Sequence, residues 1–176
     1  MAAPALSDMQ RAKAYSCHRL KNNNMTNSEL AQAIDERVFS EKTDKGGMPY
    51  IYHLGRVAEC SKSFGRIQMD IDEDTAQAVA WLHDILEDCQ EWNWIHLSQL
   101  FGLEITNAVV AITKDYDESY DKYISRVKNN KYARIVKICD MTDNMDISRL
   151  NEITEKDIER IQKYHKAFIY LKNNEI

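Results

Sequence analysis

The sequence contains few residues that interrupt helices. It has only five Gly and two Pro among 176 residues, whereas the helix-favouring residues Ala, Leu, Glu, Lys, Gln and Met are frequent. No stretch shows the alternation of apolar and polar residues that is typical of a strand. We therefore predict an all-α protein, and because 176 residues is the usual size of one domain, a single compact helical bundle over residues 1–176.

Three further absences narrow the class of protein. An excess of basic residues is lacking, since the formal net charge is −5 and the pI is about 5.6, whereas general nucleic-acid binders are more often basic. No apolar run approaches the ~18 residues that span a bilayer, and the N-terminus lacks the pattern of a signal peptide. We expect no nucleic-acid partner, no membrane partner and a cytoplasmic location.

Closely spaced cysteines are also lacking. The four cysteines form no C-x-x-C pair, and no two are near each other in sequence; they are Cys17, Cys60, Cys89 and Cys139. Zinc knuckles and the disulfide frameworks of small secreted domains need regular, short spacings. The pattern indicates free thiols in a reducing compartment.

The helices are predicted from apolar residues that recur at steps of three and four. We expect them at about 6–20, 28–40, 49–64, 75–89, 94–101, 103–113, 118–128 and 131–149, with a last helix after the capping-box-like segment 154–157. Residues 1–25 form an extension ahead of the main body. The helix at 75–89 is apolar nearly all round, which predicts a position in the centre of the core.

That central helix carries four ionisable groups near its end, in the segment AVAWLHDILEDC. His83 and Glu87 are four residues apart, and so are Asp84 and Asp88, so a helix would place the two pairs in adjacent stripes. Burying such groups costs several kcal/mol each unless they pair with a charge or bind a metal. Residues 75–91 contain no Lys or Arg, so a cation from elsewhere is needed.

Two other apolar segments offer groups of the same kind. His53 lies in MPYIYHLGRVA, 48–58, and Asp140 lies in KICDMTDNM, 137–145. Taken singly, His53 is explained as a hydrogen-bonded core histidine and Asp140 as the partner of a buried lysine such as Lys137. One metal site explains all of these groups together, and two imidazoles with two carboxylates suit Mn, Fe, Zn or Co.

His53, the His83-Asp84 doublet and Asp140 resemble the H…HD…D signature of the HD-domain metal-dependent phosphohydrolases. The segments TDKGGMPYIYH, AVAWLHDILED and IVKICDMTDNMD are similar to the hydrolase domain of Rel/Spo-type alarmone enzymes, especially the short stand-alone hydrolases. The similarity runs from about residue 26 to 172. It implies an HD-domain fold and an enzyme that hydrolyses the nucleotides ppGpp and pppGpp at the 3′ position, releasing pyrophosphate.

The resemblance also implies roles for individual residues. The metal, usually manganese, would be bound by His53, His83, Asp84 and Asp140. The catalytic residues would be Glu87 and Asp88, which act on the attacking water, and Asn144, beside the metal and the phosphate. The substrate-binding residues would be Lys45, Arg56, Arg160 and Tyr164.

The sequence departs from the family pattern near the expected site. Leu54 follows His53 where proline is frequent, Met141 follows Asp140, and Lys42 stands in the preceding loop. These differences leave the nucleotide open. Two alternatives therefore stand beside the alarmone: an HD phosphohydrolase acting on NADPH or a nucleoside phosphate, and a nucleotide-binding regulatory protein without turnover. The sequence does not indicate the oligomeric state.

Overall fold

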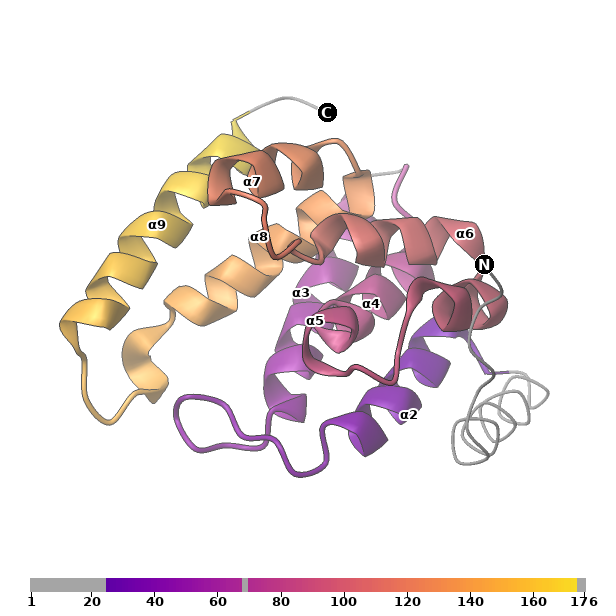
Figure 1. Ribbon diagram of the computed structural model, residues 1–176, viewed down its shortest axis with the longest axis horizontal. Helices are drawn as coiled ribbons and strands as arrows, with labels where there is room; N and C mark the ends of the chain where they lie inside the picture. Colours follow the sequence, from indigo (N-terminus) through magenta and orange to yellow (C-terminus); the bar gives the residue numbers. More distant parts are fainter. Residues whose placement is uncertain (1–24, 68–69, 174–176) are drawn as a thin grey trace.

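The computed structural model describes residues 25–67 and 70–173, and all regular elements in those ranges are helices (Figure 1). They are α2 (Asn27–Val38), α3 (Ile51–Ile67), α4 (Glu73–Leu82), α5 (Ile85–Asp88), α6 (Trp94–Ile112), α7 (Tyr120–Lys128), α8 (Lys131–Met145), the short 3-10 helix η1 (Ile147–Arg149) and α9 (Glu155–Lys172). The all-α prediction is therefore confirmed for this part of the chain. The helix predicted at 6–20 lies outside the described residues.

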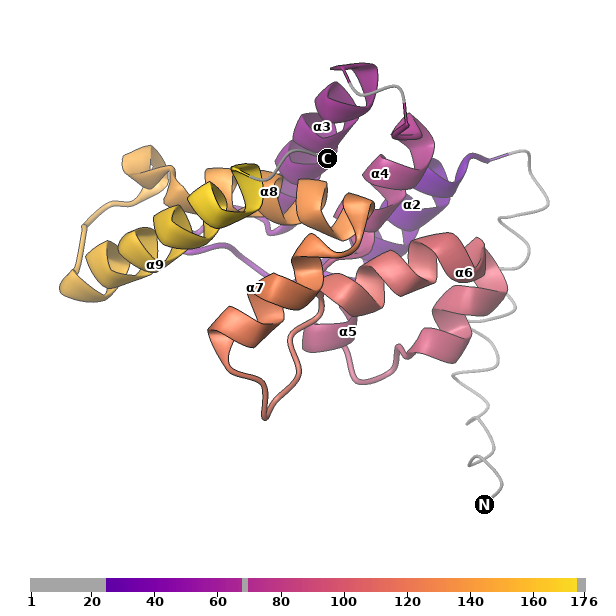
Figure 2. The same cartoon turned by 90° about the horizontal axis from the view of Figure 1, so that it is seen from above.

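Helix α4 forms the centre of the fold, as its apolar sequence predicts. It packs against α2, α3, α6 and α8, and the two views in Figures 1 and 2 show it surrounded by these helices. Thr75, Ala76 and the whole stretch Ala78–Leu82 are buried. The Asp72 side chain begins the helix by accepting a hydrogen bond from the Thr75 amide, the usual role of an N-cap carboxylate.

The prediction of one continuous helix over 75–89 is wrong, because α4 ends at Leu82 and α5 begins at Ile85. The His83 ring donates from Nδ1 to the Ala80 carbonyl at 2.7 Å. In a continuous helix that carbonyl would accept from the amide of residue 84, so the imidazole competes with the helical hydrogen bond. His83 and Asp84 therefore lie in a turn, and the four ionisable groups do not form two stripes on one helix.

Helix α6 is the one described helix that is long and apolar enough, by its 19 residues and its composition, to cross a membrane. It is interrupted at Gly102, whose φ of 77° is non-helical, so the two helices predicted at 94–101 and 103–113 are both present. Buried side chains such as Leu97, Ile105 and Val109 pack it into the core. We therefore assign α6 to the core of the fold.

Helix α9 returns along α8 and also contacts α7 (Figures 1 and 2). The capping box predicted at its start is present: Thr154 Oγ1 accepts from the Asp157 amide, and the Asp157 carboxylate accepts from the Thr154 amide. This reciprocal pair fixes where the helix begins. It thereby sets which residues of α9 face α8.

The prediction of free thiols is wrong for two cysteines. Cys60 of α3 and Cys139 of α8 form a disulfide, with Cα atoms 5.8 Å apart and a sequence separation of 79. Cys89 is free, and Cys17 lies outside the described residues. Only the packing of α3 against α8 brings the pair together. The cysteines thus no longer support a reducing compartment, and the cytoplasmic location stays a prediction.

Candidate metal centre

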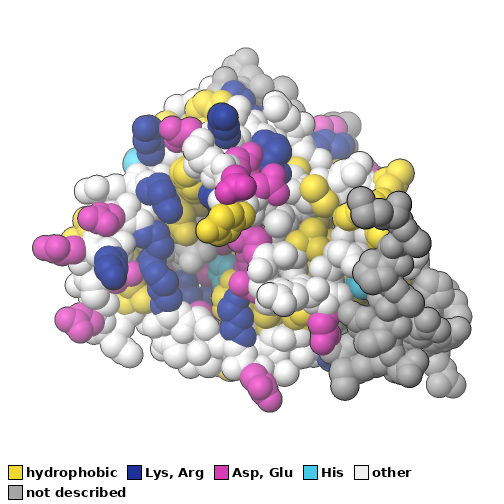
Figure 3. Space-filling model, in the orientation of Figure 1, with side chains coloured by type: hydrophobic (Ala, Val, Ile, Leu, Met, Phe, Trp, Pro, Cys, Tyr) yellow, Lys and Arg dark blue, Asp and Glu magenta, His cyan; other side chains and the backbone are white. Residues whose placement is uncertain are grey.

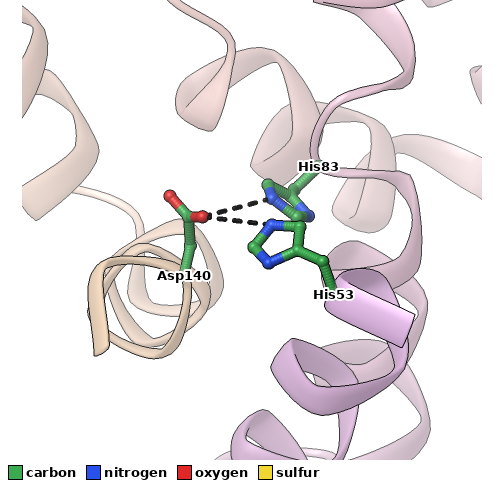
Figure 4. A group of neighbouring side chains, drawn as sticks. All are labelled: His53, His83 and Asp140. Carbon is green, nitrogen blue, oxygen red and sulfur yellow. Dashed lines mark ion pairs between the residues drawn. The ribbon is translucent and has the colours of Figure 1, made fainter. Parts of the chain in front are cut away.

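Three helices each bring one predicted ligand to the same buried point. His53 comes from α3, His83 from the end of α4 and Asp140 from α8, and one ligand atom of each lies within 4.8 Å of the others. Asp140 Oδ1 is 3.4 Å from His53 Nε2 and 3.6 Å from His83 Nε2. Figure 4 shows the carboxylate pointing between the two imidazoles. The predicted convergence of these three residues is therefore present.

The hydrogen bonds of the two imidazoles fix which nitrogen faces Asp140. His83 Nδ1 donates to the Ala80 carbonyl, and His53 Nδ1 lies 2.7 Å from the Asp143 carboxylate. Because these oxygens only accept, Nδ1 of each ring carries a hydrogen, so in the neutral ring it is Nε2 that offers a lone pair. Buried His83 Nε2 has no hydrogen-bond partner among the described residues. This is the arrangement of a metal-binding histidine.

Asp84 completes a shell of negative charge around His83. Its Oδ2 atom lies 3.1 Å from His83 Nε2 and accepts a hydrogen bond from the Tyr50 hydroxyl. Burial lowers the pKa of His83, but Asp84 and Asp140 outweigh it and raise the pKa well above its usual value. A positive charge is thus strongly favoured at this point. Neutral imidazoles and carboxylates around it fit a divalent transition ion.

Asp140 is held on both sides. Its Oδ2 accepts from the Lys137 ammonium at 2.8 Å, and its Oδ1 accepts from the Asn144 amide at 2.6 Å. Burial opposes ionisation of Asp140, but Lys137 and the two imidazoles outweigh it, so its pKa lies well below the usual range. Both expectations for Asp140 are therefore met: Oδ2 pairs with Lys137, and Oδ1 faces the two imidazoles. Asn144 lies against the proposed ligand.

Asp143 is a residue of the site that the sequence reasoning missed. It accepts from His53 Nδ1 and also from Arg56 and Arg149. Burial opposes its ionisation, but the hydrogen bonds from His53 and Arg56 lower its pKa to about 2. Its position three residues after Asp140, on the same side of a helix, was the available signal. Arg56, predicted to bind substrate, is engaged with Asp143 here.

We expect Asp143→Asn to weaken binding of Mn²⁺ by about 10- to 100-fold, the usual effect of changing the group that orients a metal-binding histidine. The asparagine oxygen still accepts from His53, but the negative charge behind the imidazole is lost. Calorimetric titration of metal-free protein with Mn²⁺ measures the change. Asp117→Asn, an exposed substitution, is the control, and equal affinities of both variants would refute a role for Asp143.

Glu87 and Asp88 lie at the exposed edge of the site. Glu87 Oε1 accepts from the Lys114 amide at 2.6 Å, a partner that the sequence does not indicate. Partial loss of solvent around the carboxylate raises the pKa of Glu87, the hydrogen bond from the Lys114 amide lowers it, and nearby Asp84 raises it further. Asp88 forms an ion pair with Lys42 of the loop before α3. The structure thus places both predicted catalytic carboxylates beside the cluster, each with a partner of its own.

The other predicted substrate-binding residues gather at the start of α9. Lys45 Nζ and Arg160 Nη1 lie 3.8 and 2.8 Å from the same Asp157 Oδ1 atom. The Arg160 contact lacks hydrogen-bond geometry, and its Nε and Nη1 atoms have no hydrogen-bond partner among the described residues. Burial raises the pKa of Tyr164, the charge of Lys137 lowers it, and the charge of Asp140 raises it. Tyr164 therefore lies on the side of α9 that faces the cluster.

Figure 3 shows a hollow on this face of the molecule, with a histidine side chain at its floor and Lys and Arg side chains along its edge. The whole chain has a net charge of −5. These basic side chains place positive charge on the edge of the hollow, beside the acidic side chains that the same view shows there. Such an edge is suited to an anionic ligand.

Asp35 of α2 is a second residue that the sequence reasoning missed. It is fully buried, and neither carboxylate oxygen has a hydrogen-bond partner among the described residues. Burial raises its pKa well above the usual value; His83 opposes this rise and Asp84 adds to it. Asp35 is therefore favoured as a neutral carboxylic acid near His83 of the candidate metal centre.

This raised pKa predicts a particular pH dependence of stability. An acid with a higher pKa in the folded state binds more protons there, so its contribution to stability falls as pH rises from the unfolded pKa of about 3.9 towards the folded value. As pH rises above about 4, Asp35→Asn should therefore gain stability relative to the wild type, by up to about 1.4 kcal/mol per pH unit. Urea unfolding of both proteins across this range is the measurement. A difference that does not change with pH would contradict the prediction.

No family model and no curated protein matches this sequence. Among solved structures, the chain is similar to a metazoan ortholog of SpoT that hydrolyses ppGpp and plays a role in starvation responses. The two share a TM-score of 0.66 and 17% sequence identity, over 85% of this chain and 87% of that one. This chain has the fold of that hydrolase. The fold expected from the resemblance is thus confirmed, and the similarity extends over most of both chains.

Proposed function

We propose that this protein is a metal-dependent phosphohydrolase that hydrolyses ppGpp and pppGpp at the 3′ position and releases pyrophosphate. The observation that carries the proposal is the buried convergence of His53, His83 and Asp140, in which His83 Nε2 faces a carboxylate and has no hydrogen-bond partner among the described residues. Its support from outside the chain is the fold shared with a protein that hydrolyses ppGpp. The expected partner is a small nucleotide.

His53, His83 and Asp140, with Asp84 beside them, would hold one divalent ion, for which we propose manganese. When bound, such an ion lowers the pKa of water and offsets charge on phosphate oxygens. The chain keeps the donors ready: Nδ1 of each histidine is occupied, and Lys137 and Asn144 hold the carboxylate of Asp140. A preformed donor set loses less conformational freedom on binding.

The reaction adds water to the phosphorus attached to the ribose 3′ oxygen, and the bond from that phosphorus to the 3′ oxygen breaks. Pyrophosphate leaves, and the 3′ oxygen takes up a proton and becomes a hydroxyl. Glu87 would accept the proton of the attacking water, and its raised pKa brings it closer to that of an effective general base at neutral pH. The Lys114 amide fixes its orientation. Asp88 would help Glu87 to position the attacking water. Its ion pair with Lys42 connects it to the loop that carries Lys45.

The substrate carries several negative phosphates, which the chain must bind next to its own carboxylates. Lys45 and Arg160 stand together at Asp157, and Arg160 has hydrogen-bond donors without partners among the described residues. A guanidinium forms two parallel hydrogen bonds with a phosphate. We propose that Arg160 and Lys45 turn from Asp157 to the phosphates, with Tyr164 and Arg56 lining the same site.

Arg160→Lys is expected to raise KM about tenfold or more with a smaller change in kcat, because lysine lacks the planar, two-pronged donor geometry of arginine. The contact lies away from the breaking bond, so it stabilises bound substrate and transition state alike. Steady-state kinetics with ppGpp and Mn²⁺ give both constants. Lys156→Arg, an exposed substitution in the first turn of the same helix, is the control. A fall in kcat alone would contradict this role.

The function itself is tested with a panel of nucleotides in the presence of Mn²⁺, with the products separated by chromatography. Pyrophosphate released from ppGpp supports the proposal. Inorganic phosphate released from NADPH or a nucleoside monophosphate, with ppGpp left intact, would keep the metal mechanism and overturn the substrate. Binding without turnover of any nucleotide would favour the regulatory alternative.

A further inference from the structure

A second cavity lies between α7 and α9, two helices in contact with each other (Figures 1 and 2). Its volume is about 520 Å³, within the range of small-molecule sites. Buried Ile124 and Ala167 line it, together with Tyr120, Lys163 and Lys166. None of the proposed metal ligands lines this cavity.

The lining combines aromatic rings with positive charge. Tyr120 and Tyr170 supply the rings, and Lys163 and Lys166 supply two ammonium groups against the single carboxylate of Asp121. Lys166 is exposed and has no hydrogen-bond or ion-pair partner among the described residues. The cavity is therefore locally positive, although the whole chain is acidic.

This cavity shares a wall with the candidate metal centre but is distinct from it. The Tyr120 hydroxyl lies 4.0 Å from the sulfur of Met141, the residue after Asp140. The ammonium of Lys163 lies 4.7 Å from the centre of the Tyr120 ring and 5.3 Å from that of Tyr164. Tyr120 thus lines the cavity and also contacts the helix that carries Asp140.

We propose that this cavity is a second ligand site, which binds a nucleoside monophosphate. The flat base packs on the tyrosine rings over the apolar floor, since aromatic side chains stack on any base. The phosphate meets Lys166 and Lys163, because the lysine ammonium binds phosphate as a point charge. The aromatic rings, the apolar floor and the pair of lysines match the two halves of such a ligand.

The proposal is tested by calorimetric titration of the full chain with GMP in the presence of EDTA, so that metal does not contribute to binding. Lys166→Glu should weaken GMP binding about tenfold or more, because a charged hydrogen bond is replaced by repulsion. Asp121→Asn should strengthen it about two- to threefold, because a repulsive charge is removed. Lys62→Glu on α3, the same charge reversal elsewhere, should leave the affinity unchanged.

Two further arms distinguish this site from the proposed catalytic site. Arg160→Ala should leave GMP binding intact, and inorganic phosphate should bind more weakly than GMP. The proposal is overturned if GMP does not bind, if Arg160→Ala rather than Lys166→Glu weakens it, or if phosphate binds as tightly as GMP. Because no arm measures turnover, its failure is distinguishable from failure of the proposed hydrolase activity.

Discussion

Asp140→Ala is expected to abolish metal binding and turnover and to lower the free energy of unfolding by about 3–5 kcal/mol. One carboxylate oxygen of Asp140 faces both imidazoles, and the other accepts from Lys137. Without the carboxylate, the ammonium of Lys137, whose side chain is only 14% exposed, is left uncompensated. Elemental analysis measures the metal, and urea unfolding measures the stability.

A second substitution separates these two roles of Asp140. Adding Lys137→Met removes the uncompensated charge with a side chain of similar length, so the double variant should recover most of the lost stability. It should still bind no metal. If Asp140→Ala retains metal, or if Mn²⁺ stabilises it as it stabilises the wild type, then Asp140 is the partner of Lys137 and no more, and the metal centre as proposed is wrong.

Glu87→Gln is expected to lower kcat by ~10²-fold or more, the usual contribution of a general base, while metal content stays unchanged. Glutamine keeps the size of the side chain, and its oxygen can still accept from the Lys114 amide. Because burial raises the pKa of Glu87, the acid limb of the profile of kcat/KM against pH should lie above the ordinary glutamate range. That limb should be absent from the variant.

The matched control is Glu104→Gln, an exposed substitution on α6, which should leave kcat and the pH profile unchanged. Full turnover by the Glu87 variant would show that Glu87 is a solvated residue at the end of a helix, without a role in catalysis. Loss of metal from that variant would instead assign the residue to the metal shell. Each result would overturn its role as a base in the proposed reaction.

The helices were predictable because their signals are local. Apolar steps of three and four residues indicate α3 and α9, and Thr154 with Asp157 forms the capping box that the sequence suggests. The same local reasoning failed at His83. There a side chain hydrogen-bonds to the Ala80 carbonyl, and such competition with the helical backbone cannot be read from apolar periodicity.

The sequence by itself determined the helical class and the central position of α4, because residue type and spacing decide which side chains are buried. The three groups that meet at the candidate metal centre were predicted from the resemblance to the HD-domain signature. Only the tertiary structure decided the rest. The disulfide of Cys60 with Cys139, the support of His53 by Asp143 and the meeting of Lys45 with Arg160 each join separate segments of the chain. Such contacts depend on the distance and direction at which packed helices present their side chains, which a linear pattern does not encode.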